Sequence, residues 1–294
     1  MYSLKARNES GDMIDITGSE DYDVIKIDGL TPAAAEVSMQ EAVGYDGGMF
    51  SYSRTNSRNI VIELALCGDI EIARQRLYTY FPPKKYMRLY FESEYRRVYI
   101  DGYTESVEGN LFELGQKIQI SIICPKPYFI DNSNPEYELT PAQTMGVFEF
   151  PFEVDTSSQG IEFSQRSSDG LSASIPGGET ESGIIFYINF NRYTTSPRDI
   201  TISNETAKTA MTVKNNDLWG SDKGLLYINS FDGEKQAYYR KSNGTLINVI
   251  PYITITGDWV KLIPGTNLLT IKNTETSGQS YTAYCHAYRY FLGV

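Results

Sequence analysis

Apolar and polar residues alternate along several short stretches of the chain. In residues 116–124, isoleucine occupies every second position at Ile118, Ile120 and Ile122, which places these side chains on one face of a β-strand. Residues 95–107 form a second such stretch, and the Gly and Asn at residues 108–110 tolerate the positive φ of a hairpin loop. The pattern recurs at residues 253–257 and 269–273. It predicts a mainly β protein.

One stretch has helical periodicity instead. Apolar residues recur there every three or four positions, at Ile70, Ala73, Leu77 and Phe81. Asp69 can cap the N-terminus of a helix, and the proline pair at residues 82–83 ends it because the residue before a proline avoids the α region. We therefore expect one helix over about residues 69–81, with its apolar side against a strand at residues 59–66.

Length and proline distribution predict two domains. At about 150 residues per domain, a chain of 294 residues has room for two. Five of the 12 prolines lie between residues 125 and 151, and such clustering is typical of a domain edge. We expect an N-terminal domain over residues 1–130, a linker over 131–150 and a second β domain over 151–294.

The charge balance limits the possible partners. The chain has 37 Asp and Glu against 26 Lys and Arg, a formal net charge of −11. Nucleic-acid readout needs a basic surface, so we expect no sequence-specific nucleic-acid binding, although DNA can still pass nearby. The longest apolar run, residues 60–67, contains Glu63 and is far shorter than the ~20 residues that span a bilayer. No membrane insertion is expected, and the polar N-terminal residues predict no secretory signal.

Residues suited to catalysis or metal binding are few. His286 is the only histidine, which excludes multi-histidine metal sites. Cys285 is adjacent to it, but neighbours in a strand point to opposite faces and cannot form a nucleophile–base pair. The stretch Glu153-Val154-Asp155 resembles the start of a glycosidase motif, but the closing glutamate is absent. We therefore predict no enzyme, no catalytic residue, no metal site and no cofactor.

The cysteines predict a reducing environment. Cys67, Cys124 and Cys285 lie far apart in the sequence and are odd in number. Such a set fits free thiols in a reducing cytoplasm better than a disulfide framework.

Two groups of aromatic residues could bind partners. Trp219 and Trp259, together with Tyr238 and Tyr239, could form a platform for stacking sugars, or they could be core residues, which is the more common role of aromatics in strands. Residues 44–59 are rich in Gly, Ser and Asn and too long for a tight turn. They are either an ordinary loop or an arm or belt hairpin that reaches a neighbouring copy through its large side chains, Tyr45, Met49, Phe50 and Tyr52.

Four stretches within the first 130 residues carry a family resemblance. They are Arg-Asn-Ile-Val-Ile at 58–62, Leu-Tyr-Thr-Tyr-Phe-Pro-Pro-Lys-Lys at 77–85, Arg-Arg-Val-Tyr-Ile-Asp-Gly-Tyr at 96–103 and Ile-Gln-Ile-Ser-Ile-Ile-Cys-Pro-Lys-Pro-Tyr-Phe at 118–129. In this order they resemble the distal tail protein family of long-tailed, siphovirus-type bacteriophages, most strongly members from phages of Gram-positive hosts. Residues 253–257 and 262–267 resemble the final strands of that family's C-terminal domain.

The resemblance implies a fold and a role. The fold would be mainly β, with an N-terminal tail-tube-like β-sandwich that has one α-helix and a C-terminal galectin-like (jelly-roll) β-sandwich. The protein would form a homo-hexameric ring as the hub of the tail tip or baseplate and let DNA pass. Its partners would be the tail-tube protein, the tail-associated lysin or tip protein, and receptor-binding proteins. It would be found at the tail tip of the virion after assembly in the host cytoplasm.

Two other functions stay open. One is a carbohydrate-binding, lectin-like module that recognises host cell-wall saccharide through Trp219 and Trp259. The other is a β-sandwich hydrolase, which the missing second carboxylate disfavours.

Overall fold

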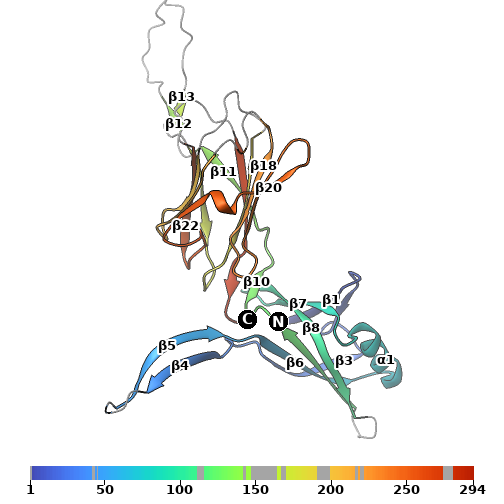
Figure 1. Ribbon diagram of the computed structural model, residues 1–294. Coiled ribbons are helices and arrows are strands. Elements are labelled where there is room, and N and C mark those ends of the chain that lie inside the picture. The colour runs from blue at the N-terminus through green and yellow to red at the C-terminus, as the bar shows by residue number, and fades with distance from the viewer. Residues whose placement is uncertain are drawn as a thin grey trace, which may run out of the picture. The chain divides into compact units, whose positions relative to one another are not determined.

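The computed structural model describes most of the chain, shown in Figure 1. The described residues are 2–41, 44, 46–110, 116–141, 144–146, 164–166, 170–190, 199–215, 218, 222–273 and 281–294. They divide into two compact units, one of residues 1–133 with 290–294 and one of residues 134–289. The mainly β character expected from the alternation is confirmed, since strands dominate both units.

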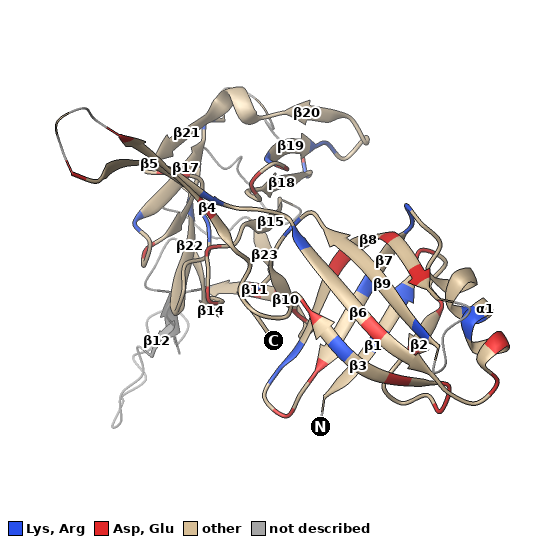
Figure 2. Ribbon diagram, turned by 90° about the horizontal axis from the view of Figure 1, so that it is seen from below, with Lys and Arg blue, Asp and Glu red and all other residues tan. Residues whose placement is uncertain are grey.

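The first unit is built on one antiparallel sheet, whose main strand order is β2-β1-β7-β8-β9-β6-β3. The small strands β10 and β24 pair with each other beside β8. In chain order these strands are β1 (Ser3–Asn8), β2 (Met13–Asp15), β3 (Tyr22–Asp28), β6 (Arg58–Leu66), β7 (Tyr86–Glu92), β8 (Arg97–Gly109), β9 (Lys117–Cys124), β10 (Phe129–Asp131) and β24 (Tyr290–Phe291). Acidic and basic residues are interspersed along this sheet (Figure 2).

The alternation in the sequence decides which face of this sheet is buried. Ile118, Ile120 and Ile122 of β9 are all buried, together with the alternate residues of β6. Strands β8 and β9 pair antiparallel, as the hairpin prediction requires. The predicted loop starts later than expected, because residues 108–109 still belong to β8.

The predicted helix is confirmed as α1 (Ile70–Tyr80). The Asp69 carboxylate accepts a hydrogen bond from the backbone N–H of Ile72 at 3.2 Å, which caps the first turn. Ala73 and Leu77 are buried in the core of the first unit, and the helix contacts β6 as expected. The buried apolar side of the helix is narrower than the sequence indicated, because Ile70 is 38% exposed.

The C-terminus belongs to the first unit, although the sequence assigned it to the second domain. Phe291 of β24 pairs with Phe129 of β10, and the backbone N–H of Val294 donates to the carbonyl of Leu30 at 3.1 Å. The second unit is therefore an insertion between two neighbouring strands of the first. No local pattern reports this pairing because the partners are far apart in sequence.

Arg58 fixes this arrangement from inside the first unit. Its side chain is buried, and its guanidinium lies 4.6 Å from the centre of the Phe129 ring. It donates hydrogen bonds at 2.5–2.8 Å to four backbone carbonyls, those of Gly29, Thr31, Pro127 and Leu292. A single side chain thus connects the C-terminal segment to three other segments of the unit.

The second unit is a β-sandwich with one continuous core. Its strand order is β20-β19-β18-β15-β23-β11-β14-β22-β16-β17-β21. The strands are β11 (Glu136–Pro141), β14 (Gly170–Pro176), β15 (Ile184–Asn189), β16 (Ile200–Asn204), β17 (Thr209–Val213), β18 (Leu225–Asn229), β19 (Gln236–Arg240), β20 (Leu246–Asn248), β21 (Ile253–Thr256), β22 (Thr266–Asn273) and β23 (Thr282–Ala287), with a short 3₁₀ helix at Ile250–Tyr252. A separate pair is formed by β12 (Thr144–Gly146) and β13 (Ser164–Arg166).

This unit corrects the expected linker at residues 131–150. Strand β11 lies within that interval and pairs with β23 over residues 136–139 and with β14 over residues 140–141. It connects the two halves of the sandwich. Pro135 therefore precedes a strand and Pro141 ends it, and neither lies in a linker. The strands expected at residues 253–257 and 269–273 are present as β21 and the end of β22.

Candidate functional site

A two-stranded ribbon lies apart from the large sheets. It consists of β4 (Ala35–Glu41) and β5 (Gly48–Thr55), which pair only with each other among the described strands. Every residue of β5 and all but one of β4 are exposed. Of the two interpretations of residues 44–59, the ordinary loop is corrected: the interval is mostly strand, as an arm hairpin requires, and its partner strand begins at Ala35. The alternation Ala-Glu-Val-Ser-Met-Gln at residues 35–40 was the signal that could have revealed it. That the ribbon reaches a neighbouring copy stays a prediction.

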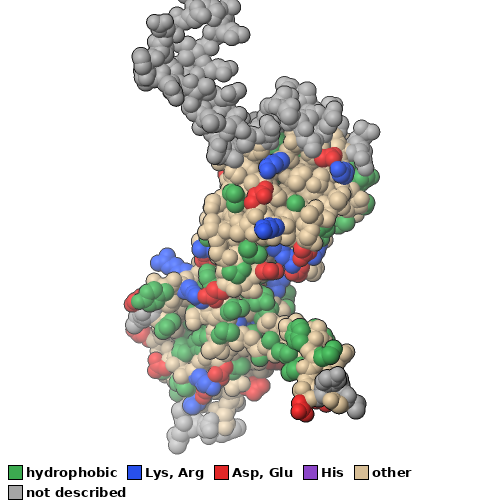
Figure 3. Space-filling view, turned by 90° about the vertical axis from the view of Figure 1, so that its left-hand side faces the viewer, with side chains coloured by type: hydrophobic (Ala, Val, Ile, Leu, Met, Phe, Trp, Pro, Cys, Tyr) green, Lys and Arg blue, Asp and Glu red, His purple; other side chains and the backbone are tan. Residues whose placement is uncertain are grey.

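The register of this ribbon separates its large side chains into two faces. Met39 pairs directly with Phe50, and Val37 lies two residues before Met39 on the same face. These three apolar side chains are 63%, 65% and 52% exposed, respectively. They form an apolar face that no other described residue covers. Hydrophobic side chains are visible in green on the projecting hairpin at the lower right of Figure 3.

The opposite face is more polar. It carries Met49 and Tyr52, which pair with Gln40 and Ser38. Arg54 and Glu36 form an ion pair at 2.7 Å on this face. The predicted contact residues Met49, Phe50 and Tyr52 thus lie on one ribbon but not on one face, while Tyr45 lies outside the described residues.

Such a ribbon has physical reasons to associate. An isolated two-stranded hairpin is marginally stable in water, because it has no core of its own. Its outer edges leave backbone N–H and C=O groups free to pair with another chain. Exposed apolar side chains gathered on one face are typical of an interaction site. The arrangement therefore suits binding to another protein surface.

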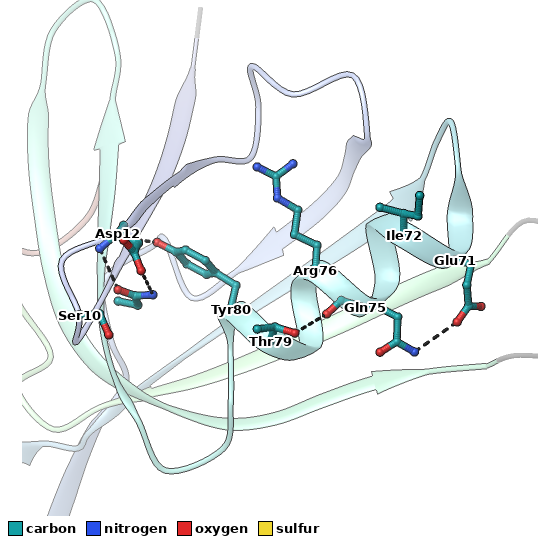
Figure 4. A pocket seen from close by; sticks show the side chains of 9 residues that line it. Ser10, Asp12, Glu71, Ile72, Gln75, Arg76, Thr79 and Tyr80 are labelled. Atoms are coloured by element: carbon teal, nitrogen blue, oxygen red, sulfur yellow. Dashed lines mark hydrogen bonds between the residues drawn. The ribbon is translucent and has the colours of Figure 1, made fainter.

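A second exposed feature is a groove of about 710 Å³ between α1 and the β1–β2 turn (Figure 4). Most of its polar groups already have partners: Gln75 donates to Glu71 at 3.2 Å and the Thr79 hydroxyl donates to the Gln75 carbonyl at 2.9 Å. The Tyr80 hydroxyl lies within 2.7 Å of the Ala6 carbonyl, and burial raises its pKa to about 12. The groove has no paired nucleophile and base, so it lacks the geometry of a catalytic centre.

The thiols and the histidine do not converge either. Cys124 and Cys285 are buried, and burial raises the pKa of each to about 12, so both are protonated at neutral pH. Cys67 donates to the Asp23 carboxylate at 3.3 Å, and this hydrogen bond raises its pKa. Cys285 and His286 lie on opposite faces of β23, as predicted. Within the described ranges no cluster of His, Cys, Asp or Glu is placed to hold a metal ion.

Only one of the two predicted saccharide contacts, Trp259, lies within the described residues. Trp219 lies outside the described residues. Trp259 is half-buried against the core of the second unit, and the Lys235 ammonium lies 5.6 Å from the centre of its ring. Among the described helices, none has the length and apolar character needed to cross a membrane.

Comparisons with known proteins connect this fold to phage tails. Residues 15–124 match the family model of the phage tail protein RIFT-related domain. The crystal structure of Dit (gp 19.1) of phage SPP1, described as a paradigm of the hub adsorption apparatus in phages that infect Gram-positive hosts, superposes with a TM-score of 0.61 at 14% identity, covering 99% of each chain. A chain of the phage P2 baseplate in its calcium-activated conformation gives a TM-score of 0.51 at 12% identity over 100% of both chains.

No curated protein matches the chain in sequence. The family match covers much of the first unit, and the structural match to SPP1 Dit extends over both units. The fold prediction drawn from the four sequence stretches is confirmed. The chain therefore shares the fold of SPP1 Dit, and its residues 15–124 match the phage tail protein RIFT-related domain.

Proposed function

We propose that this protein is the hub of a siphophage tail tip or baseplate and that six copies close into a ring through the β4–β5 ribbon. The observation that carries the proposal is the exposed apolar face of Val37, Met39 and Phe50 on a ribbon without a core. If this face packs on the first unit of the next copy, a closed ring of six copies has six such contacts and leaves none of these faces exposed. A contact in which each copy binds the next is the kind that generates rings.

The family-model match and the shared fold support the hub role. The ring joins the tail tube to the tail-associated lysin or tip protein, and the second unit provides a platform on which receptor-binding proteins dock. The protein acts by assembly and not by catalysis. It functions in the virion, at the tail tip, and is assembled in the host cytoplasm, where its three free cysteines stay reduced.

The acidic composition suits a channel for DNA. Six chains of −11 each carry a total of −66. Carboxylates that face the channel repel the phosphate backbone and prevent DNA from sticking, over a range of about 10 Å in 0.1 M salt. A channel lined mainly by Lys and Arg would contradict this part of the proposal without affecting the ring.

The experiment that tests the proposal replaces residues 35–55 with a short Gly/Ser linker. Because Ala35 and Thr55 pair directly, a linker of a few residues can join residues 34 and 56 without disturbing the large sheet. We expect this variant to be folded and monomeric, while the unchanged protein forms rings, as measured by native mass spectrometry. Rings of unchanged mass in the variant would refute the role of the ribbon.

A further inference from the structure

A row of tyrosines crosses the outer face of the second unit. Tyr238, Tyr227, Tyr187 and Tyr284 come from the adjacent strands β19, β18, β15 and β23 and are directly paired in that order. Their ring centres are separated by 4.6, 5.4 and 4.6 Å. Three strand spacings of about 4.8 Å give the row a length of ~14 Å.

The row keeps its hydroxyl groups available. The residues that flank each tyrosine along its strand are buried in the core, so the tyrosines lie on the opposite, outer face and are only half-buried. Within the described part of the chain, the hydroxyls of Tyr187, Tyr238 and Tyr284 have no hydrogen-bond partner. Burial raises the pKa of Tyr187, so its hydroxyl remains a donor as well as an acceptor at neutral pH.

A basic pocket adjoins one end of the row. Lys223, Arg240 and Lys241 line a pocket of about 350 Å³ together with Asn189 and Leu225. Arg240 and Leu225 pair directly and lie two residues from Tyr238 and Tyr227, so they share the outer face with the tyrosines.

The three cations of this pocket are only partly compensated, because Lys241 interacts electrostatically with the adjacent Asp222 carboxylate. None of them forms an ion pair with a carboxylate in the described ranges. The adjacent Asp222 carboxylate is already engaged, since it accepts hydrogen bonds from Ser242 and from the Tyr239 hydroxyl. In a chain with a net charge of −11, three cations beside the Asp222 carboxylate leave this pocket with a net positive charge, which marks a place for an anion.

The opposite end of the face is acidic. Glu136 and Glu138 lie on β11, where they pair with His286 and Tyr284. Strand β11 is four strand positions from β19, a separation of ~19 Å. This exceeds the screening length of about 10 Å at 0.1 M salt. An anionic group is therefore attracted to the β19 end, with little opposition from the two glutamates.

The packing of the rings indicates what kind of chain can lie along the row. The planes of Tyr187 and Tyr284 are 10° apart, and those of Tyr227 and Tyr238 are 20° apart, so the rings of each pair stack on one another. Nucleic-acid bases need free ring faces on which to stack, and these faces are largely occupied. What the row offers instead is ring edges and hydroxyl groups, which suit the C–H and O–H groups of sugars and polyols.

We propose that this face binds a phosphodiester-linked sugar or polyol chain, with a phosphate in the pocket of Lys223, Arg240 and Lys241 and the polyol units along the tyrosine row. Arg240 supplies a planar fork for two phosphate oxygens, and the two lysines add mobile positive charge. The site uses neither Trp219 nor Trp259. It does not depend on ring formation, because all its residues lie in the second unit.

The test uses the full-length protein and poly(glycerol phosphate), titrated by isothermal calorimetry at low salt. We expect saturable binding that weakens as salt rises, because the pocket acts through charge. The triple substitution K223Q/R240Q/K241Q should weaken binding about tenfold or more. The hydroxyl-deleting pair Y187F/Y238F should weaken it several-fold while leaving the ring stacking intact, by analogy with removing single exposed hydrogen bonds.

Matched controls distinguish a specific binding site from non-specific electrostatic attraction. The triple substitution K208Q/K214Q/K272Q removes the same charge from strands and turns of the other half of the sandwich, and we expect it to change the affinity less than twofold. Neutral dextran and a single-stranded oligothymidine should bind much more weakly than the polymer. Absence of saturable polymer binding, equal loss in both triple variants, or equally tight oligothymidine binding would overturn the proposal. Native mass measured on the same variants should stay that of the unchanged protein, so failure here is distinguishable from failure of the ring.

Discussion

Substitution of Phe50 by Ser should disassemble the ring without unfolding the chain. Phe50 is 65% exposed on the apolar face of the β4–β5 ribbon. A large aromatic side chain has about 200 Å² to bury, so ~130 Å² of Phe50 remains for a partner to cover. At about 25 cal/mol per Å², this area is worth ~3 kcal/mol for each subunit contact. The equilibrium constant of each contact should therefore fall by about 100-fold.

The effect on folding should be small, because the side chain makes no core contact in the isolated chain. Sedimentation velocity over a concentration series measures the first effect, and thermal unfolding of the dissociated chain measures the second. The matched control is Y95S, since Tyr95 is 95% exposed in the turn between β7 and β8 and belongs to no proposed contact. The pair M49S/Y52S, on the more polar face, should weaken the ring less than F50S does.

Two results would refute the reasoning on Phe50. If F50S rings persist at the same concentrations as unchanged rings, the apolar face is not buried in the assembly. If F50S lowers the melting temperature as strongly as a core substitution, the ribbon packs on its own chain instead of on a neighbour.

Three further predictions concern the first unit and the thiols. Replacing Arg58 by Lys should lower the free energy of unfolding, measured by urea titration, by about 3 kcal/mol or more. A single ammonium cannot donate to all four carbonyls, so buried acceptors would be left unpaired. An unchanged urea midpoint would contradict the role of Arg58. Replacing residues 134–289 by a short Gly/Ser linker should leave a folded first unit that still forms rings, because Ile130 and Tyr290 pair directly on either side of the deletion. Aggregation of this variant, seen by size-exclusion chromatography, would contradict the independent folding of the first unit. At pH 8 the native protein should react with at most one iodoacetamide per chain, at Cys67. Burial raises the pKa of Cys124 and of Cys285 to about 12, so both thiols stay protonated and inaccessible. Labelling of either buried thiol in the native state, seen by peptide mass spectrometry, would contradict their burial.

The features that local sequence could predict are those whose cause is local. The isoleucines of β9 share a face because strands have a period of two residues, and α1 starts at Asp69 because its carboxylate can cap a helix. The ordered stretches at residues 58–62, 77–85, 96–103 and 118–129 added the family resemblance, which the fold supports.

The features that the sequence missed are caused by pairing over long distances. The return of β24 to β10 and the hydrogen bond from Arg58 to Leu292 join segments more than 150 residues apart. The tyrosine row likewise depends on the register of four separate strands, and no single strand reveals it. The β4–β5 ribbon was partly missed because Gly, Ser and Asn near its tip indicated a loop, while the alternation in residues 35–41 was the better guide.

The mass of the unchanged protein in solution tests the central claim most directly. Six chains of 33.2 kDa give about 199 kDa, and multi-angle light scattering after size-exclusion chromatography should find this mass or a multiple of it, with annular particles in electron micrographs of the same fraction. A single species of 33.2 kDa at high protein concentration, with no annuli even in the presence of the tail-tube and tip proteins, would contradict the claim that this chain builds a ring.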